Sequence, residues 1–112
     1  LYVRLQQEAP YTASSLLAQF DEPRAADAWP RLLRLPADAP NRDPEAWRTV
    51  AVPTLILANH TDLTHPYAYA ESLVAAIPNA SLVEVPSKAV DQGGHVAAAR
   101  AHIDNFLQSL MA

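Results

Sequence analysis

The feature that most constrains this 112-residue chain is a short apolar run at residues 52–58, Val-Pro-Thr-Leu-Ile-Leu-Ala. Its length and branched side chains are typical of a buried β-strand, and Pro53 stands near the start, where a backbone donor is least needed. Residues 59–66, Asn-His-Thr-Asp-Leu-Thr-His-Pro, are polar and irregular, so the strand is predicted to end in a loop.

A helix and a second strand are predicted to follow this loop. Residues 67–77 carry apolar side chains at helical spacing, and residues 81–86 are again mostly apolar. A final helix is predicted after residues 87–94, and we interpret its apolar stripe as core packing. The stripe consists of Val96, Ala99, Ile103, Phe106, Leu107 and Leu110.

Two polar residues follow the carboxyl ends of the two predicted strands. Strands joined by one helix are expected to lie parallel, with a right-handed crossover, so both loops emerge at the same edge of the sheet. Neighbouring strands are about 4.8 Å apart. Asp62 in the first loop and His95 after the second can therefore meet. A carboxylate bound to one imidazole nitrogen fixes the tautomer and makes the other nitrogen a general base.

The first strand and its loop resemble those of the α/β-hydrolase family. Residues 52–66 are similar to the family's penultimate strand and acid-bearing loop, whose usual pattern is V-P-T-L-x-x-x-G-x-x-D-x-x-x-P. Asp62 and Pro66 stand at the matching positions, and Asn59 replaces the usual Gly.

The resemblance continues through the rest of the chain and covers residues 49–110. Residues 75–86 resemble the family's helix, turn and last strand, and His95 with the helix after it resembles the catalytic His and the C-terminal helix. The loop at residues 87–94 is longer than the common Gly-rich form.

The family's nucleophile has no counterpart in this sequence. The family carries it as the serine of a G-x-S-x-G turn that precedes the acid. The only glycines here are Gly93 and Gly94, both after Asp62, and they serve either a close backbone approach or only a turn. The sequence therefore resembles the C-terminal part of a hydrolase whose first half is missing.

The resemblance implies an α/β fold class, as a partial α/β-hydrolase. A helical, cap-like segment is expected at residues 1–48, and a β-α-β-α segment with parallel strands at residues 49–112. In the intact enzyme an upstream serine would attack an ester-like carbon, His95 would take its proton, and Asp62 would orient His95. The chain alone is expected to be inactive. The alternative is a non-enzymatic interaction or binding module derived from this fold.

The cap-like segment is predicted to consist of short helices separated by prolines. We expect Thr12 to cap a helix that runs to Phe20, and a second helix to start near residues 21–23. Pro30 should kink the second helix unless it starts later. A short capped helix is expected at residues 43–47.

Caps of this kind line the substrate pocket, so the resemblance implies that Phe20 and Trp29 contact an apolar substrate. The alternative is that these two side chains pack the cap against the body of the protein, as aromatic residues at helical spacing usually do.

The candidate site residues have simpler interpretations that stay open. Asp62 is also typical of a turn in which the carboxylate binds its own loop backbone, and His95 of a helix start. His60 and His65 lie close to Asp62 in sequence, but no further ligand is apparent, so no metal site is expected. Glu84 alternates with apolar neighbours, which predicts an outward-facing side chain.

Composition limits the classes of partner. A net charge of −4 argues against nucleic acid, and no apolar run approaches the length of a membrane span. The absence of cysteine excludes disulfides and thiol catalysis. No signal peptide is apparent, and we expect a cytoplasmic protein without cofactors. Its expected partner is the small-molecule substrate of the intact enzyme.

The strand at residues 54–58 is also predicted to mediate self-association. No segment before residue 49 has the pattern of a strand, so one edge of this strand should lack a neighbour, and it carries no charge to prevent pairing. We therefore expect a homodimer in which two copies of residues 54–58 pair antiparallel.

Overall fold

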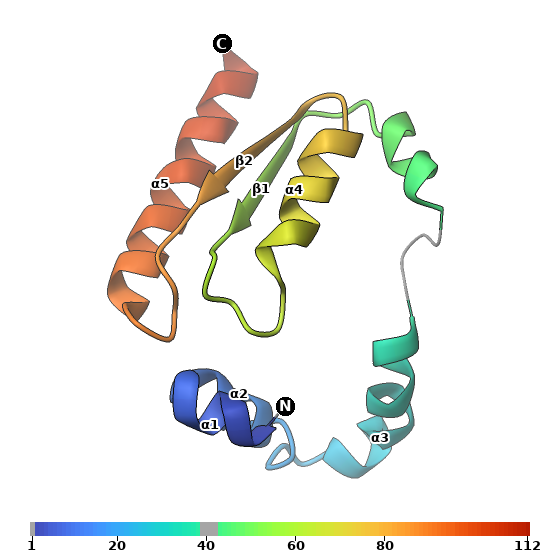
Figure 1. The fold of residues 1–112 in the computed structure, drawn as a ribbon, viewed down its shortest axis with the longest axis vertical. Helices are drawn as coiled ribbons and strands as arrows, with labels where there is room; N and C mark the ends of the chain where they lie inside the picture. The colour runs from blue at the N-terminus through green and yellow to red at the C-terminus, as the bar shows by residue number, and fades with distance from the viewer. Residues whose placement is uncertain (1, 39–42) are drawn as a thin grey trace. The chain divides into compact units, whose positions relative to one another are not determined.

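The computed structural model describes residues 2–38 and 43–112. The chain forms two compact units, Leu1–Arg42 and Asp43–Ala112 (Figure 1). The second unit thus begins six residues before the predicted boundary between residues 48 and 49.

The first unit contains three α-helices and a short 3₁₀ turn. The helices are α1 (Tyr2–Glu8), α2 (Pro10–Ala18) and α3 (Ala25–Arg34), and the 3₁₀ turn is η1 (Leu35–Ala37). Among the described residues of this unit the buried side chains are Leu5, Ala9 and Ala13, which follow one another at intervals of four residues.

Proline positions explain where the helices of the first unit begin and break. Pro10 has no backbone N–H and disfavours helical geometry at the residue before it, and Ala9 accordingly has φ −147° and ψ 65°. Pro10 begins α2, since a first-turn N–H has no intrahelical partner in any case. The prediction that Thr12 caps this helix is wrong, because Thr12 lies inside α2.

The second predicted helix starts two residues after residues 21–23, which does not bring Pro30 into its first turn. It begins at Ala25 and contains Pro30 at its sixth position. The short capped helix predicted at residues 43–47 is confirmed as η2 (Pro44–Thr49), which belongs to the second unit. The Asp43 carboxylate accepts a hydrogen bond from the Glu45 backbone N–H at 3.0 Å and caps η2.

The second unit has the predicted order of strands and helices. It consists of η2, β1 (Thr54–Ala58), α4 (Tyr67–Ala76), β2 (Ala80–Glu84) and α5 (Gln92–Met111). The two strands are parallel, with Thr54 opposite Ala80 and Ala58 opposite Glu84, and α4 and α5 flank them in Figure 1. The predicted fold class, α/β with parallel strands as in a partial α/β-hydrolase, is confirmed.

The core of the second unit is small. Ala70, Ile77 and Val85 are its buried apolar residues, and α4 contacts both strands and η2. A side-chain hydrogen bond also joins the segments that precede the two strands: Asn79 Nδ2 donates to the Ala51 carbonyl oxygen at 2.7 Å.

The interpretation of the last apolar stripe as core packing is wrong for most of its residues. α5 has no buried residue, and the large side chains at positions 96, 103, 107 and 110 are exposed. A helix of 20 residues is about 30 Å long. Five-residue strands are only about 17 Å long, so two of them cannot cover it.

None of the helices in residues 2–38 and 43–112 is long and apolar enough to cross a membrane.

Candidate active site

Both candidate catalytic residues follow the carboxyl ends of adjacent strands. Ala58, the last residue of β1, lies opposite Glu84, the last residue of β2, and the Val85 N–H donates to the Ala58 carbonyl at 2.9 Å. The loop after β1 carries Asp62, and the segment after β2 leads to His95 in α5. The two loops therefore leave the sheet at the same edge.

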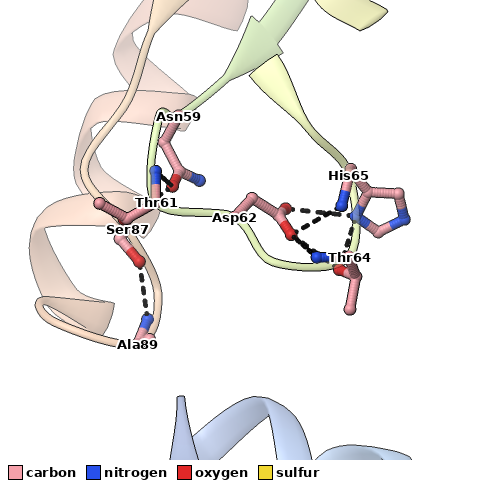
Figure 2. Close-up of polar contacts among 7 residues, drawn as sticks. All are labelled: Asn59, Thr61, Asp62, Thr64, His65, Ser87 and Ala89. Atoms are coloured by element: carbon pink, nitrogen blue, oxygen red, sulfur yellow. Dashed lines mark hydrogen bonds and ion pairs between the residues drawn. The ribbon is translucent and has the colours of Figure 1, made fainter. Parts of the chain in front are cut away.

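The loop after β1, residues 59–66, is built from two successive turns closed by side chains. In the first, Asn59 Oδ1 accepts hydrogen bonds from the backbone N–H and the hydroxyl of Thr61, each at 3.1 Å (Figure 2). In the second, Asp62 Oδ1 accepts from the Thr64 backbone N–H at 2.8 Å, the Thr64 hydroxyl at 2.7 Å and the His65 backbone N–H at 2.9 Å. This segment is called the acid loop below.

The second oxygen of the Asp62 carboxylate has a single, longer contact. His65 Nδ1 lies 3.2 Å from Asp62 Oδ2 and 2.9 Å from the Thr64 hydroxyl oxygen. Because a carboxylate only accepts, Nδ1 carries the proton in this arrangement. The Asp62 side chain is 30% exposed and the His65 side chain 84% exposed.

These contacts keep Asp62 ionised. Burial is the largest single influence and raises the pKa of the carboxyl. The hydrogen bonds from the Thr64 hydroxyl, from the two backbone N–H groups and from the His65 ring together outweigh burial and lower the pKa to about 2. Asp62 is thus a carboxylate at any pH where an esterase works.

His95 is held in the tautomer that a general base requires. Its Nδ1 lies 2.8 Å from the Pro86 carbonyl oxygen, which can only accept, so Nδ1 is the donor. In the neutral ring Nε2 is then the acceptor, the atom that would take a proton from a nucleophile.

The start of α5 positions His95, which is the fourth residue of this helix. The Asp91 carboxylate caps α5 by accepting the Gly94 backbone N–H at 2.8 Å. A Cβ at position 94 would collide with this carboxylate, whereas a Cβ at Gly93 would make only an ordinary contact with it. Neither glycine has a positive φ, so Gly94 serves a close approach and not a left-handed turn.

The structure does not join Asp62 to His95. Among the described residues no hydrogen bond links the two side chains, and Asp62 contacts His65 instead. Asp62 does form the local turn that was its alternative interpretation. This turn occupies Oδ1 and leaves Oδ2 with one long contact, so it does not exclude an orienting role, and the catalytic pairing stays a prediction.

The sequence interpretation missed a contact between the acid loop and β2. His60 Nδ1 lies 2.7 Å from Glu84 Oε1, and the His60 ring stacks on Tyr67 at 3.7 Å between centroids. The strand register indicates this contact. Glu84 lies opposite Ala58, and side chains two residues apart in an extended chain point to the same face, so His60 is expected on the same face as Ala58, next to Glu84.

The other predicted site residues are exposed. Phe20 and Trp29 lie in the first unit, each 53% exposed, and their contact with a substrate stays a prediction. Within the described ranges no three His, Asp or Glu side chains are grouped so as to hold a metal ion.

Two parallel strands with acid and base candidates in the loops at their carboxyl ends define part of an α/β-hydrolase. The chain belongs to the TAP-like protein family of α/β-hydrolases, whose family model matches residues 19–111. No curated protein and no solved structure gave a match.

The cap of α5 predicts different outcomes for two neighbouring substitutions. Replacing either glycine with alanine favours a helix by about 1 kcal/mol. Gly94→Ala also displaces the Asp91 cap, which costs about 1 kcal/mol. Gly94→Ala should therefore be about 1 kcal/mol less stable than its matched control Gly93→Ala in urea denaturation. Equal stabilities of the two variants would contradict the cap geometry.

The low pKa of Asp62 predicts a pH-dependent contribution to stability. The folded pKa of about 2 lies below the ordinary value of 3.8, so the stabilisation is complete above about pH 4 and is lost as the pH falls toward 2. Asp62→Asn should destabilise the chain by about 1–2 kcal/mol at neutral pH. The difference from wild type should shrink progressively below about pH 4.

Denaturant titrations between pH 7 and pH 3 measure this difference. Asp104→Asn, at an exposed position in α5, is the matched control and should leave the stability nearly unchanged at every pH. A wild-type advantage over Asp62→Asn that stays constant down to pH 3 would show that the charge of Asp62 does not stabilise the loop.

Proposed function

We propose that this chain supplies the acid and the base of a Ser-Asp-His triad that hydrolyses an ester-like small molecule. Asp62 is the acid and His95 is the base. The nucleophilic serine lies outside residues 1–112, because this sequence contains no G-x-S-x-G turn. The chain is therefore inactive by itself.

The observation that carries this proposal is that the two loops begin next to each other, at the carboxyl ends of β1 and β2. The register places the ends of β1 and β2 side by side, so the acid loop and the His95 segment start one strand spacing apart. Membership in an α/β-hydrolase family and the Nδ1-protonated tautomer of His95 support the same assignment.

Each side chain has a defined step in the proposed reaction. His95 Nε2 takes the proton of the serine hydroxyl as the oxygen attacks the substrate carbonyl, and later returns it to the leaving group. Asp62 stabilises the resulting imidazolium through Oδ2, which requires the His95 Nδ1–H to change its partner from the Pro86 carbonyl to Asp62. An oxyanion hole outside this chain stabilises the tetrahedral intermediate. Phe20 and Trp29 are proposed to contact the substrate.

Turnover of p-nitrophenyl esters tests the proposal at two levels. The isolated 112-residue chain should give no turnover above the buffer rate, since a base without a nucleophile has nothing to activate. In the natural gene product that contains these residues and a serine nucleophile, His95→Ala should lower kcat by about 10³-fold. Binding of a substrate analogue should be nearly unchanged.

His102→Ala is the matched control, because His102 lies on the same helix seven residues after His95. It should leave kcat within about twofold of wild type. Full activity of His95→Ala would overturn the assignment of the base, and His65, which already contacts Asp62, would be the next residue to replace. Esterase activity of the isolated chain would reveal a nucleophile within residues 1–112.

We also propose a homodimer through the free edge of β1, in which two copies of residues 54–58 pair antiparallel. In the part of the chain that the structure describes, β1 has one strand neighbour, β2. A sheet of two strands is marginal by itself, and pairing at this edge makes four strands. The exposed apolar side chains of α5 also favour association.

Light scattering of the purified chain tests the dimer. Wild type should have twice the mass of the 12.2 kDa chain at micromolar concentration. The N–H groups of Leu55 and Leu57 face away from β2, because Thr54 and Ala58, at the alternate positions, bond to the β2 side. Leu57→Pro removes a donor on the free edge and should give a monomer, whereas Val90→Ala, at an exposed loop position, is the control that should stay dimeric. A folded wild-type monomer at high concentration would overturn the proposal, as would a dimer in which the edge of β1 is protected by another segment.

A further inference from the structure

His60 is the residue that connects the acid loop to its surroundings. It lies two residues beyond the end of β1, and its partners come from two other elements: Glu84 ends β2 and Tyr67 begins α4. Its Nδ1 is 2.7 Å from Glu84 Oε1, and its ring lies 3.7 Å from the Tyr67 ring with 19° between the planes. The three side chains together are called the His60 clamp below.

The clamp differs in kind from the other hydrogen bonds of the acid loop. The side-chain bonds formed by Asn59, Asp62 and Thr64 join residues no more than three positions apart. Such bonds fix the internal shape of the loop but do not fix its place against the sheet. The bond from His60 to Glu84 spans 24 positions, and in the described parts of the chain it is the only side-chain hydrogen bond between residues 59–66 and β2.

The bond between His60 and Glu84 can form in either protonation state of the imidazole. A carboxylate only accepts, so His60 Nδ1 donates to Glu84, and both the neutral Nδ1–H ring and the imidazolium can do this. The hydrogen bond from His60 lowers the pKa of Glu84, which keeps the acceptor ionised. Stacking on Tyr67 restricts the rotation of the ring and fixes the direction in which Nδ1 points.

We propose that His60 is a positioning residue for Asp62: the clamp fixes the acid loop against β2 and α4 and so maintains the hydrogen bonds that orient the Asp62 carboxylate. The clamp acts on the loop conformation, and only its catalytic consequence rests on the proposed function. Glu84 and Tyr67 act in the same way, through His60.

Nuclear magnetic resonance of the isolated chain tests the clamp without any turnover. The Thr64 and His65 backbone N–H groups donate to Asp62, so their hydrogen exchange reports on the loop, and the carboxyl ¹³C shift of Asp62 reports its pKa. In His60→Ala both amides should exchange about two- to fivefold faster, as expected for the loss of a bond between two side chains that are more than half exposed. The pKa of Asp62 should rise from about 2 toward its ordinary value of 3.8.

Two further variants separate the contribution of the hydrogen bond from that of the ring stacking. His60→Phe keeps the stacking and loses the bond, whereas Glu84→Gln keeps a neutral acceptor at an exposed site and tests the clamp even if His60→Ala fails to fold. Each should give an intermediate effect. His102→Ala, on α5, is the control and should change neither readout. The amide of Val83 in β2 faces β1, as that of Val85 does, so its exchange reports the stability of the sheet and should stay slow in all variants.

Two outcomes would overturn the proposal. One is unchanged Thr64 and His65 exchange and an unchanged Asp62 pKa in His60→Ala. The other is equal acceleration at Val83, which would mean that His60 stabilises the sheet in general. Neither readout depends on a serine nucleophile, so the clamp and the hydrolase proposal fail independently. In an active full-length protein, His60→Ala should lower kcat and leave KM nearly unchanged, since it misplaces the acid without touching the substrate.

Discussion

The parallel pairing of β1 with β2 is the constraint on which the rest of the second unit depends. Parallel strands need a crossover, and α4 supplies it and covers the strands with Ala70 and Ile77. The same pairing makes both following loops leave from one edge of the sheet. A one-residue slip of the register would turn Glu84 away from His60 and move the base segment relative to the acid loop.

The acid loop and the segment that carries His95 are held by different physical means. The acid loop is fixed by its own side chains, Asn59 and Asp62, each of which replaces a backbone turn with a side-chain acceptor. The base segment has few such bonds and takes its position from the start of α5, where the Asp91 cap requires the absence of a Cβ at Gly94. The internal shape of the acid loop is thus defined locally, whereas the position of His95 depends on how the long helix α5 packs on the sheet.

The sequence was sufficient for the features that depend on neighbouring residues. The strand β1 follows from its apolar run, and the cap of η2 follows from Asp43. The prediction that Thr12 caps α2 failed because Pro10, a residue that favours the first turn of a helix, determines where α2 begins. The contact of His60 with Glu84 depends on strand register, which joins residues 24 positions apart and has no local pattern. The contact between Asp62 and His65 was not predicted, because the family pattern pairs the acid with the later histidine, His95.

The exposed stripe of α5 connects the fold to the proposed chemistry. An amphipathic helix ordinarily buries its apolar face, but here Val96, Ile103 and Leu107 are exposed over a two-stranded sheet. His95 lies on this same helix, so the angle at which α5 packs on the sheet determines the position of this side chain. The Nδ1–H of His95, bound to the Pro86 carbonyl, can reach Asp62 only if that angle allows it. Because α5 also contacts β1, the packing of this helix against the sheet and the position of His95 depend on each other.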